Sequence, residues 1–300
     1  MNVRSAHQPE RPAIGVFWWF IAPFALLTIV FGVWPILLAI QTSFTESSSA
    51  LQPQAKWVGW ANYLSLWSDP VFMQSLARTL IYTGLAVSST IVCALLYALM
   101  LNSHWIGPGK LFFKVAIFLP VVAPDIAGYV VWRWLYDQSF GAINTALEAL
   151  GLPLFGGIAS VSTVLVAVLI AELWHHVGFY VIIFWANLAL CDKGQSEAAE
   201  IDGANAWQHF WHVLLPQLRP ALLVNSVYAL IQYLKTFTVV AVMTKGGPNE
   251  STNFVSYYAY QLFDQGRYGE ATAMATVLFA LVLVLAGLAM RLQRRSGQGA

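Results

Sequence analysis

Residues 79–101 read TLIYTGLAVSSTIVCALLYALML and contain no Asp, Glu, Lys or Arg. An apolar run of about 20 residues is long enough to cross the hydrocarbon core of a bilayer as a helix. Residues 14–40 and 271–290 are also free of charge. Isolated strands cannot satisfy their backbone hydrogen bonds in lipid, so these runs predict helices. Three further apolar segments contain isolated charges, at 111–136, 161–190 and 221–243.

These segments predict an all-α integral membrane protein with six transmembrane helices. The composition agrees, because 58% of the 300 residues are hydrophobic and only 10% are charged. Soluble domains are about 45–50% apolar and about 25% charged, so an ordinary soluble protein is excluded. A net charge of +1 argues against nucleic acid as a partner and leaves membrane lipid as the expected surroundings.

Lys and Arg in the short connections predict the orientation, because they are enriched on the cytoplasmic side. Six spans place both termini on one side. That side holds the larger group: Arg4, Arg11, Lys110, Lys114, Lys193, Arg219, Arg291, Arg294 and Arg295. The opposite side holds the smaller group: Lys56, Arg78, Arg133, Lys245 and Arg267. We therefore expect a cytoplasmic tail at 1–13, a first transmembrane helix at 14–40, an extracytoplasmic loop at 41–75 and a second cytoplasmic tail at 291–300.

The connection between the fourth and fifth spans, residues 191–220, has a pattern of its own. Charged residues gather between Asp192 and Asp202, and the run from Glu197 to Glu200 favours a short helix. Gln195 or Ser196 is expected to cap that helix, which puts Glu197 in its first turn. Gly203 then predicts a turn, and a second helix is expected over 204–215, before Pro216. The whole connection predicts a helical elbow on the cytoplasmic face.

The run EAAEIDGA at 197–204, followed by Phe210, Leu215 and Pro216, resembles the Glu-Ala-Ala loop of permease subunits of binding-protein-dependent ABC importers. Val213 stands where isoleucine is common in that family. The resemblance covers about residues 75–290 and is closest to the carbohydrate branch, with its maltose-type and glycerol-3-phosphate-type permeases. The stretches of this sequence that resemble that branch are Leu119-Pro120, 132–135 (WRWL), 140–144 (FGAIN) and 244–248 (TKGGP).

The resemblance implies a type I importer permease fold, with the transmembrane core at 76–290 and a coupling loop at 191–220. It implies a transport subunit rather than an enzyme, and a sugar or sugar-like solute. The implied partners are a second permease in a heterodimer, two copies of an ABC ATPase and an extracytoplasmic solute-binding protein. No cofactor is expected in this chain, because ATP and Mg would be bound by the ATPase. The implied location is a bacterial or archaeal cell membrane, the inner membrane of a Gram-negative cell. The residues expected to contact the ATPase are Glu197, Ala198, Ala199, Asp202, Gly203, Phe210, Leu215 and Pro216.

Polar residues inside the spans are candidates for the solute pathway, because polar groups are costly in a membrane. Glu172 and His176 are four residues apart, so they share a face of the fourth span. A sugar is bound by aromatic faces together with hydrogen-bonding groups. The candidates are Glu172, His176, Phe179, Asn225, Ala229, Gln232 and Tyr233. An alternative stays open, in which Glu172 and His176 form a hydrogen-bonded pair that only fixes helix packing. Asp125, which follows Pro120 and Pro124, is expected to serve a proline kink.

Two other classes of protein, a metalloenzyme and a secondary transporter, fit the sequence less well than an importer. Glu172, His175 and His176 could belong to a metalloenzyme, but neither zinc-hydrolase order, His-Glu-x-x-His or His-x-x-Glu-His, occurs and no third ligand lies at helical spacing. No catalytic or metal site is therefore expected. A secondary transporter driven by an ion gradient would need two repeated halves with interrupted helices, and those signs are weak. A permease for glycerol-3-phosphate or another polar solute remains an alternative to a sugar permease.

Overall fold

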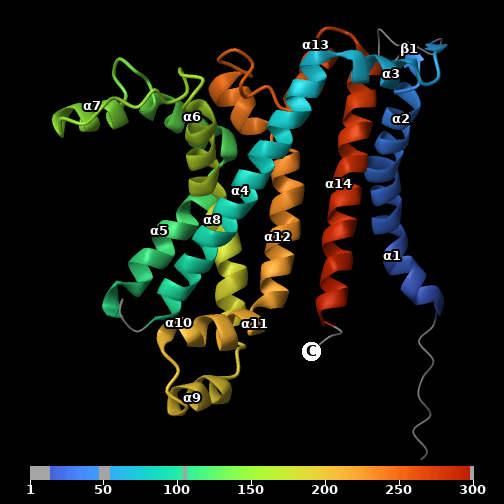
Figure 1. The fold of residues 1–300 in the computed structure, drawn as a ribbon. Helices are drawn as coiled ribbons and strands as arrows, with labels where there is room; N and C mark the ends of the chain where they lie inside the picture. The colour runs from blue at the N-terminus through green and yellow to red at the C-terminus, as the bar shows by residue number, and fades with distance from the viewer. Residues whose placement is uncertain (1–13, 47–54, 104–106, 298–300) are drawn as a thin grey trace, which may run out of the picture.

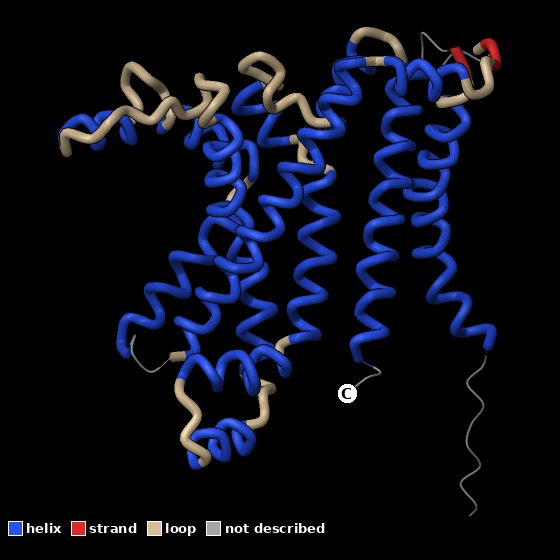
Figure 2. The backbone as a smooth tube through the Cα atoms, in the orientation of Figure 1, coloured by secondary structure: helices blue, strands red, loops and turns tan. Residues whose placement is uncertain are grey.

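The computed structural model describes residues 14–46, 55–103 and 107–297. The expected tail at 1–13, with Arg4 and Arg11, lies outside these residues, as do 47–54 of the expected loop and 298–300 of the second tail. The described chain is helical apart from loops and one short antiparallel strand pair (Figure 2). The strands are β1 (Thr45–Glu46) and β2 (Lys56–Trp57).

Four continuous helical segments among the described residues are long and apolar enough to cross a membrane. They are Trp19–Thr42, Pro70–Asn102, Val164–Leu188 and Tyr268–Arg291. The spans expected at 14–40, 79–101, 161–190 and 271–290 are therefore confirmed as helices. Their full bounds are α1 Ile14–Thr28, the π-helical turn η1 Ile29–Val33, α2 Trp34–Thr42, α4 Pro70–Asn102, α8 Val164–Leu188 and α14 Tyr268–Gly297.

The third expected span, 111–136, is not one helix. It consists of α5 (Lys110–Val122) and α6 (Asp125–Leu135), which meet at an angle of 106°. Pro124 disfavours a helical conformation for the residue before it, and Ala123 is extended, with φ −68° and ψ 147°. The kink expected near Asp125 is therefore a complete break. With 13 residues, α5 is only about 20 Å long and cannot cross a bilayer by itself.

The fifth expected span, 221–243, is also interrupted. Its helix, α12 (Arg219–Leu234), ends well before residue 243, and the chain resumes as a π-helical turn, η4 (Val240–Thr244). Neither Pro nor Gly marks this end in the sequence. The Ser256 hydroxyl donates to the Thr236 carbonyl at 2.6 Å, so a distant residue binds a backbone group that a continued helix would have used. Six spans result only if α5 and α6 are counted as one span, and the segment Ala206–Gln217 and α12, which meet at 70°, as another.

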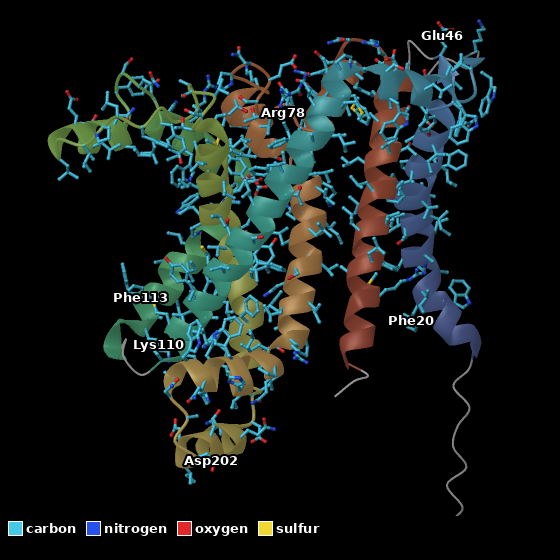
Figure 3. The ribbon with its side chains drawn as sticks, viewed as in Figure 1. Phe20, Glu46, Arg78, Lys110, Phe113 and Asp202 are labelled. Atoms are coloured by element: carbon cyan, nitrogen blue, oxygen red, sulfur yellow. The ribbon has the colours of Figure 1, made fainter. Side chains whose placement is uncertain are left out.

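Shorter helices gather at the two ends of the bundle (Figure 1). One end carries α9, α10 and α11, and we call it the elbow end; the other carries β1, α3, α7 and α13. Glu46 and Arg78 lie at that other end, whereas Lys110 lies at the elbow end with Asp202 (Figure 3). The expected separation of Lys110 from Arg78 is thus observed. The bounds are η2 Gly107–Gly109, α3 Ala61–Ser68, α7 Ala142–Ala149, α9 Lys193–Ile201, α10 Ala206–His209, η3 Phe210–Leu214, α11 Leu215–Gln217 and α13 Val255–Asp264.

The core lies where α4, α8 and α12 pack against one another. Small side chains allow this close approach, since Ala86, Ala171 and Ala229 are completely buried. α5 packs even closer to α8, because a Cβ at Gly178 would lie 2.2 Å from the Ile117 carbonyl oxygen. α14 packs against α13, α12 and α2. The polar residues of the central helices are therefore held inside a tightly packed bundle.

Candidate functional site

The elbow after α8 begins with a capped helix. The Asp192 side chain accepts a hydrogen bond from the Gly194 N–H at 2.8 Å and caps α9. The caps expected at Gln195 or Ser196 are wrong, because both residues lie inside the helix. Glu197 consequently lies in the second turn of α9, and the first turn contains no acidic residue. An aspartate in extended conformation just before the helix is the better cap, which explains the shift of the start.

Gly203 makes the expected turn at the end of α9. Its φ of +80° lies in the left-handed region that glycine adopts without strain. The N–H groups of Gly203 and Ala204 donate to the carbonyls of Glu200 and Ala199 at 3.1 and 2.9 Å. These two bonds form the glycine-terminated end that many helices use. The predicted turn at Gly203 is therefore confirmed.

The second arm of the elbow is helical from Ala206 to Gln217, as α10, η3 and α11. Asn205 and Gln208 form a reciprocal capping box at its start, with bonds of 2.9 and 3.0 Å. The helix runs through Pro216, near the start of α11, rather than ending before it. Leu218 is fully buried at the corner, where the chain turns by 70° into α12. The expected second helix at 204–215 is thus confirmed, with its end moved to Gln217.

Gln217 closes the elbow, and sequence reasoning missed it. Its Oε1 accepts from the Asp192 N–H at 2.8 Å, and its Nε2 donates to Gln195 Oε1 at 3.3 Å and to the Val213 carbonyl at 3.2 Å. One side chain therefore joins the start of α9 to the end of the second arm. Asp192 and Gln217 are 25 residues apart in the chain, so no local spacing could have paired them.

The surface of the elbow is polar with exposed apolar side chains. Ile201 is 86% exposed, Trp207 is 70% exposed, and the Trp207 and Trp211 rings lie 5.5 Å apart. Large apolar groups that remain exposed at one end of a folded bundle are typical of a binding surface. Of the candidate contact residues, Glu197, Ala198, Asp202 and Gly203 are exposed, whereas Ala199, Phe210, Leu215 and Pro216 are half-buried.

A second group of polar residues lies inside the bundle, between α4, α8 and α12. We call it the polar layer: Tyr82, Thr90, Glu172, Asn225 and Tyr233. The Tyr82 hydroxyl donates to the buried Glu172 carboxylate, with 2.6 Å between Oη and Oε2. The Tyr233 hydroxyl lies 2.6 Å from Thr90 Oγ1, and Asn225 Nδ2 donates to the Tyr180 carbonyl at 3.2 Å. Each bond joins two different helices.

The remaining pathway candidates divide by burial. Ala229 is fully buried, whereas His176, Phe179 and Gln232 are half-buried. The Phe179 ring packs against that of Tyr228, with centroids 4.7 Å apart. Tyr228 is not among the candidates from the sequence, although it is the more exposed partner, at 46%. The half-buried residues are thus the ones with surface left to contact another molecule.

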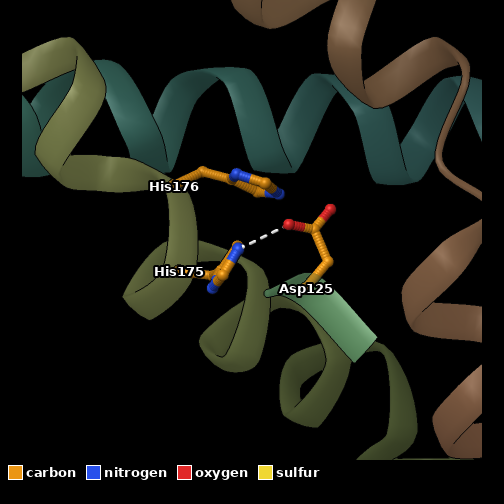
Figure 4. Close-up of side chains that lie close together, drawn as sticks. All are labelled: Asp125, His175 and His176. Carbon is orange, nitrogen blue, oxygen red and sulfur yellow. Dashed lines mark hydrogen bonds and ion pairs between the residues drawn. The ribbon is translucent and has the colours of Figure 1, made fainter. Parts of the chain in front are cut away.

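Glu172 and His176 bond to different helices. Glu172 binds Tyr82 of α4, whereas His176 Nε2 lies 3.2 Å from the Tyr129 hydroxyl of α6. The neighbouring His175 bonds Asp125 at the start of α6, with 2.8 Å between Nε2 and Oδ1 (Figure 4). Two side-chain bonds therefore hold the second half of the broken span against α8. The sequence did not reveal these partners, because they are 47 and 50 residues away.

Known proteins are similar in sequence to this chain over most of its length. The trehalose/maltose transport system permease protein MalF of Thermococcus litoralis is 29% identical over 263 residues, which are 88% of each chain. The lactose transport system permease protein LacF of Rhizobium radiobacter is 32% identical over 274 residues, 90% of each chain.

Solved structures share its fold. A bacterial ABC transporter involved in alginate import contains a chain that matches with a TM-score of 0.83 and 23% identity, covering 94% of this chain and 96% of that one. The described helices therefore have the fold of a type I ABC importer permease, as expected. The family model of the binding-protein-dependent transport system inner membrane component matches residues 70–298. The chain belongs to this family of membrane permease components.

Proposed function

We propose that this chain is the membrane-spanning subunit of an ATP-driven importer for a sugar. Its membership in the permease family and its similarity to relatives named for trehalose, maltose and lactose transport carry the proposal. A relative from Agrobacterium fabrum, 27% identical, is named for the transport of sulfoquinovosyl glycerol, a compound that also contains a sugar. A carbohydrate is therefore favoured over glycerol-3-phosphate as the solute, and an ATP-driven importer is favoured over a transporter driven by an ion gradient.

The assembly that we propose contains a second permease, two ATPase subunits and an external solute-binding protein. The elbow end would face the cytoplasm, and the end with β1, α3, α7 and α13 would face the binding protein. ATP and Mg would be held by the ATPase, and this chain would carry out no catalysis. The expected location is the cell membrane of a bacterium or archaeon, with both termini inside.

The elbow would be the surface that contacts the ATPase. Its exposed apolar residues Ile201, Trp207 and Trp211 offer area for burial, and Glu197 offers a carboxylate to a basic partner. Because Gln217 ties the two arms together and a cap fixes the start of each arm, the elbow can move as one body. Such a movement would reach α8 through Asp192 and α12 through Leu218. α8 and α12, two of the three helices that form the polar layer, would then shift relative to each other.

The solute pathway would run along α8 and α12. We assign direct solute contact to the half-buried candidates, His176, Phe179 and Gln232. The buried candidates would instead stabilise the wall of the pathway; they are Glu172, Asn225, Ala229 and Tyr233. Glu172 and Tyr233 already bond within the chain, and Asn225 and Ala229 have no exposed surface. Both roles remain parts of the proposal.

Reconstitution tests the proposal. The chain is co-expressed with permease, ATPase and binding-protein subunits from the same genome and is inserted into lipid vesicles with the subunits that co-purify. We expect ATP-dependent uptake of at least one labelled disaccharide from trehalose, maltose and lactose, and no uptake without ATP or without binding protein. Uptake of glycerol-3-phosphate alone would replace the sugar with another solute. Uptake under an ion gradient without ATP would contradict the importer function.

A further inference from the structure

Asp125, His175 and His176 form a cluster of metal-ligand side chains at the break between α5 and α6 (Figure 4). One ligand atom from each residue can be chosen so that all three lie within 4.8 Å of one another. In the part of the chain that the structure describes, no other group of three His, Cys, Asp or Glu residues comes this close. The third ligand that the sequence did not reveal is therefore supplied by a different helix, α6.

The fold builds this cluster in two ways. The break at Pro124 turns α6 by 106° from α5, so Asp125 begins a helix that faces α8. Gly128 then allows α6 to approach α8 closely, because a Cβ there would lie 3.3 Å from the Trp174 ring and 3.5 Å from His175 Nδ1. The cluster is consequently a product of backbone geometry rather than of flexible surface side chains.

The two histidines are also held in position. His175 is 1% exposed, and its ring packs against that of Tyr129 with centroids 5.5 Å apart. The Tyr129 hydroxyl lies 3.2 Å from His176 Nε2. A ligand histidine commonly donates its second ring N–H to a neighbouring acceptor, which fixes the ring; the Tyr129 oxygen can accept this bond when His176 binds the metal through Nδ1. The Asp125 side chain is 51% exposed, which leaves a route for an ion to enter.

Two imidazoles and one carboxylate suit Zn²⁺ and similar transition metals rather than Mg²⁺ or Ca²⁺, which prefer oxygen ligands. Three protein ligands leave one tetrahedral position for water. The present 2.8 Å between His175 Nε2 and Asp125 Oδ1 is a hydrogen-bond distance. In a tetrahedral zinc site two such atoms lie ~3.3 Å apart, given bonds of about 2.0–2.1 Å, so this pair needs only a small side-chain rotation. His176 must move closer as well, because the three ligand atoms are spread over up to 4.8 Å. The metal would take the place of the hydrogen-bonded proton on Nε2: a neutral His175 would carry that proton on Nδ1 instead, and a protonated His175 would release it to solvent.

We propose that Asp125, His175 and His176 bind a Zn²⁺-like divalent cation that joins the start of α6 to α8. This inference does not depend on which solute is transported. In the metal-bound chain His176 would be a metal ligand, so direct solute contact would be left to Phe179 and Gln232. The competing interpretation is a metal-free hydrogen bond between His175 and Asp125 that only sets the angle between the helices.

Zinc binding by the full chain distinguishes the two. The protein, purified with a tag free of histidine, is stripped with a chelator and titrated with ZnCl₂ in competition with a chromophoric chelator. We expect one tight Zn²⁺ site per chain. His175→Gln retains a donor for Asp125 but removes the imidazole ligand, so it should weaken binding at least about 100-fold while the chain still folds. His176→Gln should do the same, and His212→Ala, an exposed histidine of the elbow, should bind like the unchanged protein.

A second measurement covers the case in which a variant does not fold. Zn²⁺ should raise the thermal unfolding temperature of the unchanged chain and of His212→Ala, and not that of any folded cluster variant. Co²⁺ added to the stripped, unchanged chain should give the visible absorption of a tetrahedral site. Absence of a tight site in the unchanged chain, or equal affinity in His175→Gln, would overturn the proposal and leave the metal-free hydrogen bond.

Discussion

The elbow and the polar layer satisfy their polar groups in opposite ways. In the elbow, most bonds are local, such as those of Asp192 to Gly194 and of Asn205 to Gln208. In the polar layer, each bond joins distant parts of the chain: Tyr82 and Glu172 are 90 residues apart, and Thr90 and Tyr233 are 143 apart. The elbow is thus held by local chain geometry and the layer by helix packing. Substitutions in the elbow should alter its binding to a partner, whereas substitutions in the bundle should alter the stability of the whole chain.

The largest effect is expected from Gly178→Ala. The added Cβ would lie 2.2 Å from the Ile117 carbonyl oxygen and 2.8 Å from Val121 Cγ2, so α5 and α8 would be forced apart. Overpacking of this kind typically costs about 1–3 kcal/mol, and a backbone contact lies at the upper end. We expect a large loss of monodisperse protein in detergent and a lower thermal unfolding temperature.

Gly84→Ala is the matched control, because nothing lies within 4 Å of a Cβ at Gly84 on α4. The yield of monodisperse Gly84→Ala protein in detergent should equal that of the unchanged chain. Equal recovery of the Gly178 and Gly84 variants would show that the contact between α5 and α8 does not limit folding.

Tyr82→Phe should have the next largest effect. It removes the donor to Glu172 and leaves a buried carboxyl group without this partner, which costs about 1–3 kcal/mol. The unfolding temperature in detergent should fall clearly. Tyr97→Phe, on the same helix but 39% exposed, should leave it unchanged. If both variants melt alike, the hydrogen bond to Glu172 does not stabilise the bundle.

Gly203→Val tests the elbow. A β-branched residue at φ +80° costs about 1–2 kcal/mol, which should loosen the end of α9 without unfolding the bundle. We expect faster hydrogen exchange at Gly203 and Ala204, weaker co-purification of an ATPase and an unchanged unfolding temperature. Gly203→Asn should be milder, because asparagine tolerates this conformation. Identical behaviour of the two variants would mean that the positive φ is not the reason for a glycine here.

Gln217→Ala should have the smallest effect. Its bonds are largely exposed, so each contributes about 0.5 kcal/mol. The expected result is faster hydrogen exchange at the Asp192 amide with normal expression and folding. Gln195→Ala, which removes only the 3.3 Å bond to Gln217, should affect that amide less. An unchanged exchange rate in Gln217→Ala would show that the two arms are not joined by this side chain.

Particular residues show what the sequence could reveal. The long apolar runs and the Gly203 turn were predicted correctly, because hydrophobic length and positive φ are local properties. The cap at Asp192 was missed by a few residues, since several polar residues in a row could each cap a helix. Prolines 120 and 124 predicted a bend but could not give its angle of 106°.

The end of α12 was not visible in the sequence at all, because a contact from Ser256 to Thr236 takes part in it. The pairing of Glu172 with Tyr82 was likewise hidden, because helical spacing states which residues share a face and not which helix that face meets.

The sequence by itself determined that this chain lies in a membrane as helices and that one connection forms an elbow. Both follow from properties of short segments: apolar length, charge placement and backbone preference. Only the tertiary structure decided which polar groups meet inside the bundle, where two of the spans are interrupted, and that Asp125 lies beside His175. Such contacts depend on how separate helices pack, and packing is set by the shapes of all the surfaces together rather than by any one segment.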